Sequence, residues 1–431
     1  MERYRTIIIG GGLAGISTAL HLGEEALLLE RADRLGGLCV SHGADGYTFD
    51  VTGHWLHLRD PEMRRLSETG LALPATTRSS SVFSHGRLTD YPFQANLRGL
   101  PDAVIVECLT GAVEAHLEGA RAGGRPPAIH FAEHVLRSFG AGIADHFMFP
   151  YNTKLWGVPP ETISDAWCQR FVPVPDLAQI IAGAFTDENL GMGYNAAFHY
   201  PEVGGIGAFS AALARGVRHA RTAAEVAAVH LGEGWVALAD GERLGFERLV
   251  STMPLDSLVA RWIDAPEAAR EAGRRLRCAK VDYLDLGLRS SVLAGRHWVY
   301  LPDPALSIYR MGCYTNARPS MAPPGCSSLY VELRNDRPVD TDAALDDALA
   351  VLSAIGPSVD RDDVAVCQRR RIPHGYVIYD HDYPAAREAT LGALTARGVI
   401  STGRYGKWVY ASMEDALLDG RAAARALEET R

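Results

Sequence analysis

The chain has 431 residues, too many for one compact core, so two or three interleaved lobes are expected. Hydrophobic residues make up 47% of it and charged residues 22%, fractions that are typical of folded globular proteins and that disfavour disorder. The formal net charge of −9 disfavours nucleic acid as a partner, because nucleic-acid-binding proteins normally present a basic face to phosphates, although a few local arginines suffice for a small anionic substrate.

The amino-terminal residues carry the fingerprint of a dinucleotide-binding unit. A buried parallel strand is predicted over residues 6–9 and a helix over residues 13–22, and the turn between them matches GxGxxG. Glycines here permit a tight turn, close approach of the backbone to a pyrophosphate and close packing of helix on strand, while the helix N-terminus offers N–H groups to the phosphates. The expected contacts are Gly10, Gly12, Leu13, Ala14 and Gly15.

A second buried strand is predicted over residues 26–29 and leads into Glu30. A carboxylate at this position accepts hydrogen bonds from a ribose 2′-hydroxyl and disfavours a 2′-phosphate. Strand, glycine turn, helix and acid together favour a dinucleotide site over an isolated glycine-rich turn. They suit NAD as well as FAD.

The residues after Glu30 favour FAD. A basic residue, Arg31, follows the acid, and Gly36 and Gly37 come next, a pattern that resembles the flavoprotein family of amine oxidases, protoporphyrinogen oxidase and UDP-galactopyranose mutase. The resemblance implies that the backbone passes close to the FAD ribityl and phosphate groups at the glycine pair, because glycine lacks a Cβ. FAD is therefore the expected cofactor.

The same resemblance continues at intervals along nearly the whole chain. Residues 200–205 are similar to the family's YPxGG segment, and three short strands are predicted between residues 224 and 252, where the resemblance implies that the backbone of Val226 contacts the adenine. Residues 100–185 are mostly helical by periodicity. Strand-like runs at residues 281–288, 297–301, 327–333 and 364–370, within the stretch from about 277 to 371, indicate an antiparallel sheet lining a substrate cavity.

These elements predict an α/β fold in which a Rossmann-type FAD-binding domain carries a mainly helical insertion and an antiparallel-sheet substrate domain. The FAD-binding parts are expected at residues 1–95, 191–270 and 386–431. The helical cap is expected at residues 96–190 and the substrate domain at residues 271–385. No linker is long enough to mark independent domains.

Three groups of residues resemble UDP-galactopyranose mutases more than amine oxidases. The first, residues 52–57, is similar to a mobile loop in which two histidines lie over the flavin, so His54 is expected to contact the cofactor and to support its reduced state. The alternative is that His54 and His57 are polar residues on a helix face.

The second group is the YxxKxW pattern of Tyr151, Lys154 and Trp156, followed fourteen residues later by Arg170. The resemblance implies an aromatic wall and a guanidinium for the diphosphate of a nucleotide sugar. Asn96, in a segment similar to the family's pocket, is expected at the cavity edge. The alternative is that the aromatic residues pack in the core and that Arg170 is a surface charge.

The third group, residues 403–413, resembles the mutases' GRxxxYxYxDM run and precedes a helix predicted over residues 413–427. It implies flavin contacts near the helix N-terminus, where N–H groups stabilise negative charge on the reduced ring, and a contact of Tyr410 with the substrate phosphates. The expected flavin contacts here are Gly403, Arg404, Ser412 and Met413.

Two positions depart from the mutase pattern. Ser412 stands where the mutases have aspartate, and Ala279 stands where they usually have arginine, with Arg277 or Lys280 as candidate substitutes. The mutases' tyrosine-rich uridine segment is also not evident after Arg170. The sequence therefore does not decide which nucleotide base is bound or whether the diphosphate site is intact.

The resemblance implies a FAD-dependent nucleotide-sugar pyranose/furanose mutase. In this redox-neutral ring contraction N5 of the reduced flavin attacks the anomeric carbon, and the expected catalytic residues are His54, Arg170 and Tyr410. The alternative is a FAD-dependent oxidase or dehydrogenase of the amine oxidase or protoporphyrinogen oxidase type. NAD(P)H is a candidate external reductant and a homodimer a candidate assembly.

The spacing of the cysteines and the length of the apolar runs indicate in which cellular compartment the protein is expected. The seven cysteines are dispersed without a CxxC pair or metal-ligand spacing, which predicts reduced thiols and no metal site. No charged segment followed by an apolar run precedes the first strand, and the longest apolar runs are too short to span a bilayer. A cytoplasmic enzyme without a membrane span is therefore expected.

Overall fold

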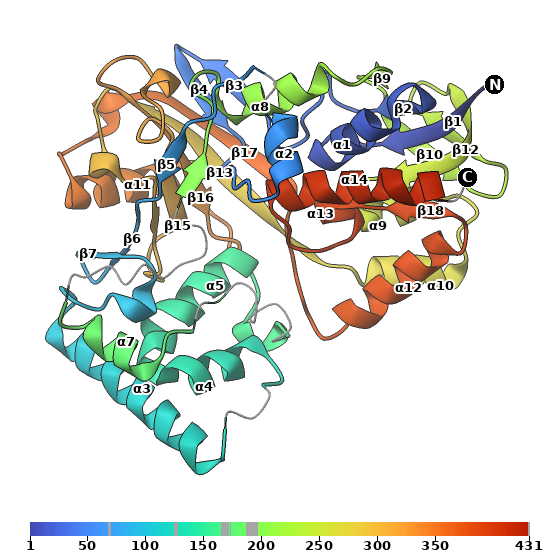
Figure 1. Ribbon diagram of the computed structural model, residues 1–431. Coiled ribbons are helices and arrows are strands. Elements are labelled where there is room, and N and C mark those ends of the chain that lie inside the picture. The colour runs from blue at the N-terminus through green and yellow to red at the C-terminus, as the bar shows by residue number, and fades with distance from the viewer. Residues whose placement is uncertain (68–69, 125–127, 165–171, 173, 187–196, 430–431) are drawn as a thin grey trace.

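The computed structural model describes residues 1–67, 70–124, 128–164, 172, 174–186 and 197–429. Two seven-stranded sheets organise these residues (Figure 1). The first sheet contains β1 (Glu2–Ile9), β2 (Ala26–Leu29), β9 (Ala220–Arg221), β10 (Val226–His230), β11 (Trp235–Leu238), β12 (Arg243–Ser251) and β18 (Val399–Ser401). β1 pairs in parallel with β2 and β12, and β18 pairs in parallel with β12, whereas β10 to β12 form an antiparallel meander.

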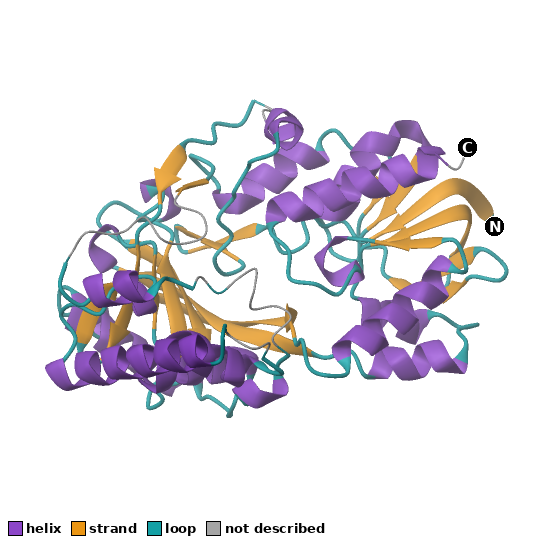
Figure 2. Cartoon of the chain, turned by 60° about the horizontal axis from the view of Figure 1, so that its bottom comes forward, coloured by secondary structure: helices purple, strands orange, loops and turns teal. Residues whose placement is uncertain are grey.

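Helices cover both faces of this first sheet (Figure 2). One face carries α1 (Leu13–Leu22) and α14 (Met413–Glu429), and the other carries α9 (Leu255–Arg261), α10 (Glu267–Arg274) and α12 (Tyr383–Thr395). Because the strands are buried on both faces, they are continuous apolar runs, and the side chains of Ile7, Ile8 and Leu28 are fully buried. The predicted Rossmann-type FAD-binding fold is confirmed.

The second sheet is antiparallel except where β14 pairs with β6. Its order is β17-β13-β16-β15-β14-β6-β7. The strands are β6 (Ser80–Ser84), β7 (Arg87–Asp90), β13 (Cys278–Leu288), β14 (Trp298–Tyr300), β15 (Ile308–Cys313), β16 (Ser327–Leu333) and β17 (Val364–Val377). The helix α11 (Thr341–Ile355) packs on this sheet. β15 is not among the strands expected from the sequence, and β6 and β7 come from residues expected in the first FAD-binding part, so that part contributes to both sheets.

The helical insertion lies beside the second sheet (Figure 1). Its described elements include α3 (Asp102–Arg121), α4 (Phe131–Ile143), the π-helical turn η3 (Ala144–Met148), α5 (Phe149–Trp156) and α7 (Leu177–Ala182). Glycines let α3 and α4 approach closely, because a Cβ on Gly140 would lie 2.0 Å from the carbonyl oxygen of Gly111. The shorter elements are β3 (Ser41–Ala44), β4 (Tyr47–Asp50), α2 (Pro61–Ser67), β5 (Ala75–Thr77), η2 (Phe93–Ala95), β8 (Ala197–His199), α8 (Gly205–Ala214) and α13 (Gly403–Gly406).

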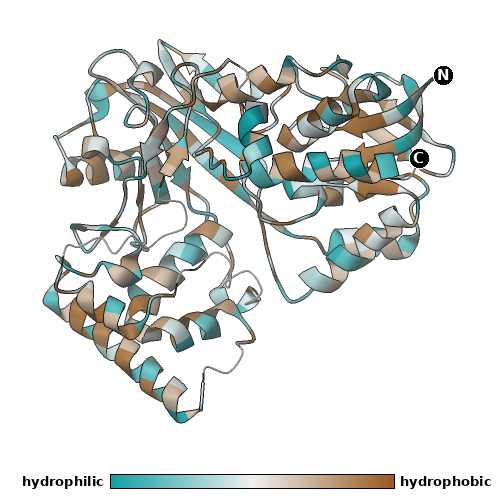
Figure 3. Ribbon diagram, in the orientation of Figure 1, coloured by the Kyte–Doolittle hydropathy of each residue, from teal (hydrophilic) through white to brown (hydrophobic). Residues whose placement is uncertain are grey.

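The distribution of apolar residues follows these layers. Figure 3 shows that the strands of the first sheet are mostly apolar and that α14, which covers this sheet, has both polar and apolar residues. This pattern is typical of a helix that buries one face and exposes the other to water. None of the helices in the described ranges has both the length and the apolar character that crossing a bilayer requires.

Candidate functional site

The glycine turn between β1 and α1 forms a cradle at the carboxyl edge of the first sheet. Gly12 is the N-cap residue of α1 and provides no side-chain cap, and the first turn of the helix has no acidic residue. Gly12 also bridges to Gly36, whose N–H donates to the carbonyl of Gly11 at 2.8 Å. The carboxylate of Glu30 accepts from the N–H of Gly11 at 2.6 Å and from the N–H of Ala32 at 2.8 Å, so the acid holds the turn.

Two of the three fingerprint glycines are needed for different reasons. A Cβ on Gly15 would lie 1.9 Å from the carbonyl oxygen of Gly10, so helix and turn could not pack. A Cβ on Gly12 would have no described atom closer than the Cα of Gly37, 3.9 Å away. The space over Gly12 and the uncapped N-terminus of α1 therefore fit the pyrophosphate of a flavin dinucleotide.

The other residues expected at the cofactor lie around this cradle. Leu13 and Ala14 form the first turn of α1 and are buried, whereas Arg31 is exposed. Val226 begins β10, and its carbonyl accepts from Nε of Arg261 at 3.0 Å. Leu13 and Ala14 belong to the cradle itself, and the contacts of all four residues with the cofactor stay a proposal.

His54 lies in a loop that follows β4. The hydroxyl of Tyr314 holds this loop, since it lies 3.1 Å from the carbonyl oxygen of Asp50 and 3.0 Å from that of Thr52. Thr52 has φ of 60°, which is strained for a β-branched residue. His57 follows in the same loop, where its Nδ1 lies 2.9 Å from the carbonyl oxygen of Ala197. Neither histidine is on a helix, so the helix-face interpretation is wrong.

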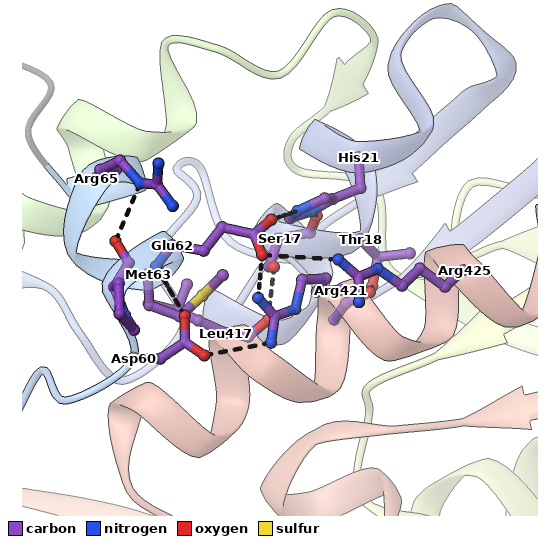
Figure 4. Close-up of polar contacts among 12 residues, drawn as sticks. Ser17, Thr18, His21, Asp60, Glu62, Met63, Arg65, Leu417, Arg421 and Arg425 are labelled. Atoms are coloured by element: carbon purple, nitrogen blue, oxygen red, sulfur yellow. Dashed lines mark hydrogen bonds and ion pairs between the residues drawn. The ribbon is translucent and has the colours of Figure 1, made fainter.

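The far end of this loop is anchored at the junction of α1, α2 and α14 (Figure 4). Asp60 caps α2 by accepting from the N–H groups of Glu62 and Met63, and its other oxygen lies 3.4 Å from Arg421 on α14. Glu62 pairs with Arg421 and lies 3.7 Å from His21 on α1. The loop that carries His54 is thus fixed to the cradle helix.

His54 is neutral at physiological pH. Burial, and then the positive charges of Arg404 and Arg310, lower the pKa of His54 to about 4. Its buried Nδ1 makes no well-aligned hydrogen bond within the described residues, although backbone contacts with Val51 and Thr52 partly offset the lowering of the pKa. A buried polar atom left in this state is costly in a folded protein, so the site fits a bound group that supplies the missing partner.

Arg404 occupies the centre of an aromatic cluster. Its guanidinium donates to the carbonyls of Gly375 at 2.8 Å and of Ala411 at 3.1 Å. The same guanidinium lies over the ring of Tyr410 at 4.7 Å and over that of Tyr376 at 5.5 Å, distances typical of cation–π contacts. Its buried Nε has no partner in the part of the chain that the structure describes.

We call the tyrosine cluster the set of Tyr151, Tyr300, Tyr309, Tyr376 and Tyr410 together with Trp156. The rings of Tyr376 and Tyr410 stack at 6.1 Å and 10°, and Trp156 meets Tyr376 edge-on at 5.8 Å. Tyr151 meets Tyr300 edge-on at 5.3 Å. The side chain of Tyr410 is 37% exposed while Tyr151 is 7% exposed, so the cluster reaches from solvent into the core.

Three residues of the site were not expected from the sequence: Tyr376, Arg310 and Glu332. Arg310 on β15 stands opposite Glu332 on β16 and donates to its two carboxylate oxygens at 2.8 and 2.7 Å. Nη2 of Arg310 also donates to the hydroxyl of Tyr376 at 3.0 Å. The structure therefore adds an ion pair to the aromatic residues that the sequence indicated.

Other expected residues are engaged in the fold. The side-chain amide of Asn96 donates to the carbonyl of Pro92 at 2.8 Å. Ser412 caps α14, since its hydroxyl accepts from the N–H of Asp415 at 3.1 Å. Gly403 packs against α1, because its Cβ would lie 2.7 Å from that of Ala14.

The two candidate substitutes for the arginine missing at Ala279 lie in ion pairs. Lys280 pairs with Asp282 at 3.2 Å and Arg277 with Asp380 at 3.4 Å. Lys280 and Asp282 both lie on β13, whereas the pair of Arg277 and Asp380 joins the residue before β13 to the segment after β17. Arg170 lies outside the described residues.

Lys154 is buried, and its ammonium group binds backbone. Nζ donates to the carbonyls of Leu301 at 2.9 Å and Ile308 at 2.8 Å, which joins α5 to the two ends of the connection between β14 and β15. Burial, and then the charge of Arg334, lower the pKa of Lys154 to about 7. Its contacts indicate that Lys154 positions the wall that carries Tyr151 and Trp156.

The lowered pKa of Lys154 predicts that stability rises with pH. Above pH 7 the folded chain releases a proton that the unfolded chain, with a lysine pKa near its usual 10.5, still holds, so the rise in pH favours folding. In urea unfolding at pH 7, 8 and 9, the free energy of unfolding of the wild type minus that of Lys154→Met should increase by about 2 kcal/mol. A difference that stays constant over this range would contradict the lowered pKa.

Comparisons with known proteins identify a family and similar structures that cover nearly the whole chain. The model of the family described as "Flavin containing amine oxidoreductase" matches residues 13–427. A crystal structure of reduced UDP-galactopyranose mutase is similar with a TM-score of 0.92 and 25% identity, over 99% of this chain and 94% of that one. A putative protoporphyrinogen oxidase from Exiguobacterium sp. 255-15 is similar with a TM-score of 0.73 and 16% identity, over 99% of each chain.

Two curated proteins are similar to short segments of the chain. An uncharacterized protein in the nifH2 3′ region of Methanothermococcus thermolithotrophicus is 41% identical over 66 residues, 14% of this chain and 64% of that protein. A pseudooxynicotine dehydrogenase of Pseudomonas sp. is 35% identical over 85 residues, 17% of each chain. The chain thus matches less than two thirds of the length of either relative.

Proposed function

Because the chain belongs to the flavin-containing amine oxidoreductase family, we propose that it is a FAD-dependent mutase that interconverts the pyranose and furanose forms of a nucleotide-activated sugar. The observation that carries this proposal is the likeness of nearly the whole chain to reduced UDP-galactopyranose mutase, with a TM-score of 0.92 and 25% identity. The arginine and tyrosine cluster supports it, since a nucleotide sugar needs aromatic surfaces and cations.

The residues around the cradle would hold the flavin. The turn at Gly12 and the N-terminus of α1 suit its pyrophosphate, and Glu30 suits a ribose hydroxyl. Nδ1 of His54 and Nε of Arg404 are buried polar atoms suited to the ring end of the cofactor. When bound, reduced flavin supplies the nucleophilic nitrogen of the proposed ring contraction.

The chain's own contribution is orientation and charge. Arg404 keeps a positive charge beside Tyr410, and Tyr410 is exposed enough to meet a substrate phosphate. Neutral His54 adds no positive charge and offers a nitrogen on the side of the flavin. Tyr151 and Trp156 form the apolar wall, and Arg170 is the further arginine proposed for the diphosphate.

A second candidate is a net oxidation, in which the flavin accepts hydride from an amine or another reduced carbon. The similarity to pseudooxynicotine dehydrogenase favours it, although only 17% of this chain is matched. The two reactions differ in their need for reduced flavin and in the oxidation state of the product.

The test uses the purified flavoprotein without oxygen. The enzyme is reduced with dithionite and incubated with UDP-galactopyranose and, separately, with UDP-galactofuranose, and the isomers are separated by chromatography. We expect interconversion by the reduced enzyme and none by the same enzyme kept oxidised. A panel of other nucleotide sugars and of NADH and NADPH as reductants identifies the sugar and the electron donor.

An oxidation would be recognised by a different pair of results. An oxidase or dehydrogenase would bleach the absorbance of its oxidised flavin when it is mixed anaerobically with an amine substrate, and the reduced enzyme would leave every nucleotide sugar unchanged. The two results together would contradict the proposed mutase activity and support the oxidation.

A further inference from the structure

A residue with a strained backbone lies between α13 and α14, two positions before Tyr410. Trp408 has φ of 55°, in the left-handed region that a bulky residue rarely adopts, and its side chain is fully buried. Such a conformation persists only where the surrounding structure holds it. We call residues 407–410 the Tyr410 segment.

Three side chains, spaced four residues apart in the sequence, hold the backbone of the Tyr410 segment. The hydroxyl of Tyr379 accepts from the N–H of Tyr410 at 2.6 Å. The hydroxyl of Tyr383 donates to the carbonyl of Trp408 at 2.9 Å, and Nε of Arg387 donates to the preceding carbonyl at 2.6 Å. Residues four apart on a helix lie on the same face, so α12 presents the last two side chains side by side. We call these three side chains the clamp.

The two tyrosines of the clamp are suited to a permanent contact. Their rings lie 4.6 Å apart, and burial raises the pKa of Tyr379 and that of Tyr383, so both hydroxyls stay protonated at physiological pH. The clamp binds backbone groups, and it therefore fixes the path of the chain. Three hydrogen bonds could join α12 to an unstrained segment equally well, whereas the observed conformation of Trp408 costs stability. Stability alone therefore does not account for the arrangement.

The path of the segment sets the direction of the Tyr410 side chain. The ring of Tyr410 stacks on that of Tyr376 at 6.1 Å and 10°, and the guanidinium of Arg404 lies over it at 4.7 Å. Rotation about φ of Trp408 would turn the chain that follows and carry this ring with it. The clamp thus controls the residue that is proposed to meet a substrate phosphate.

We propose that Tyr379, Tyr383 and Arg387 are positioning residues that hold Trp408 in its left-handed conformation and thereby direct Tyr410 toward a phosphate of the substrate. The proposal rests on the proposed function for the identity of that substrate. None of the three clamp residues is among those proposed to contact the flavin or the nucleotide sugar, so the clamp acts through Tyr410. Removal of one clamp hydroxyl lets the strained backbone relax and frees the Tyr410 ring to leave its stack.

The first test compares single hydroxyl deletions with UDP as the probe. The dissociation constant of UDP is measured by calorimetry on the oxidised flavoprotein for the wild type, Tyr379→Phe and Tyr383→Phe, which keep the rings. We expect each variant to bind UDP about three- to tenfold more weakly, in line with the loss of one neutral hydrogen bond.

The matched control is Tyr47→Phe. It also removes a buried tyrosine hydroxyl that contacts backbone, the carbonyl of Leu288 at 3.2 Å, but it leaves the Tyr410 segment untouched. Its melting temperature should fall as much as those of the clamp variants, while its affinity for UDP stays that of the wild type. Clamp variants that lose only thermal stability, as the control does, would overturn the proposal.

A Tyr410→Ala background decides whether the clamp acts through Tyr410. Once this side chain is absent, the clamp has nothing to direct, so the further change Tyr379→Phe should leave UDP affinity the same within about twofold. A loss of the same factor in both backgrounds would contradict the positioning role.

A second measurement does not depend on the substrate. A crystal structure of Y379F/Y383F should show Trp408 with a negative φ and the Tyr410 ring off its stack on Tyr376. Retention of both the positive φ and the stack would show that the clamp does not set this conformation. If the wild type fails to bind UDP at all, the proposed function fails, while the crystal structure still decides whether the clamp positions Tyr410.

Discussion

Gly12→Ala is expected to give a folded protein that purifies without flavin. Gly12 has φ of −72° and ψ of −179°, which any residue adopts, and its added Cβ would have no described atom within 3.8 Å, since the nearest is 3.9 Å away. The fold therefore tolerates the methyl group, whereas a pyrophosphate approaching this backbone does not. We expect affinity for FAD to fall at least about 100-fold, a loss of about 3 kcal/mol.

The measurement is the ratio of flavin to protein absorbance, followed by titration of the apoprotein with FAD and by circular dichroism. Gly392→Ala on α12 is the control, because a Cβ there meets nothing within 4 Å, and it should stay yellow. Gly15→Ala should instead fail to fold, since its Cβ would lie 1.9 Å from a carbonyl oxygen. A yellow Gly12→Ala protein would show that the cofactor does not cross this turn.

Arg404→Met should abolish most activity. The change leaves the carbonyls of Gly375 and Ala411 without their donor and removes the cation that lies over Tyr376 and Tyr410. Loss of one partner of a buried charged contact costs about 2–5 kcal/mol, so turnover by the reduced enzyme should fall by about 100-fold or more. Initial rates of sugar interconversion, with flavin content measured on the same samples, give the result.

Arg243→Met is the matched control for this loss. Arg243 also lies over an aromatic ring, that of Trp235 at 4.3 Å, but it is exposed at the edge of the first sheet. Its removal should leave turnover and flavin content unchanged. Equal losses in the two variants would mean that Arg404 serves general stability instead of the site.

The FAD-binding part of the fold could be predicted because its signals are local. The strand before Gly10, the glycines, and Glu30 at the end of the next strand lie within one βαβ unit, and each follows from a steric or hydrogen-bonding requirement of that unit. The resemblance extended this information to Tyr151, Trp156 and Arg404, and strand-like runs in the sequence predicted the antiparallel sheet. The structure confirms the fold class and brings Trp156 and Arg404 onto the same ring, that of Tyr376.

The ion pair behind the cluster could not be predicted, because it depends on the register of distant strands. Arg310 meets Glu332 only because β15 and β16 pair in one register, and a shift by one residue would turn one side chain to the other face. β15 itself has no clear alternation, since five of its six residues are buried. Tyr376 joins the cluster from the far edge of the same sheet.

The contact between α1 and α14 has a consequence for synthesis of the protein. The hydroxyl of Ser17 donates to the carbonyl of Leu417, 400 residues later, and Gly420 lies so close to α1 that a Cβ would be 2.3 Å from the carbonyl oxygen of Ala14. The flank of α1 that packs on α14 therefore stays uncovered on the ribosome until the C-terminal helix has emerged. A nascent chain interrupted before residue 413 leaves that flank of α1 exposed.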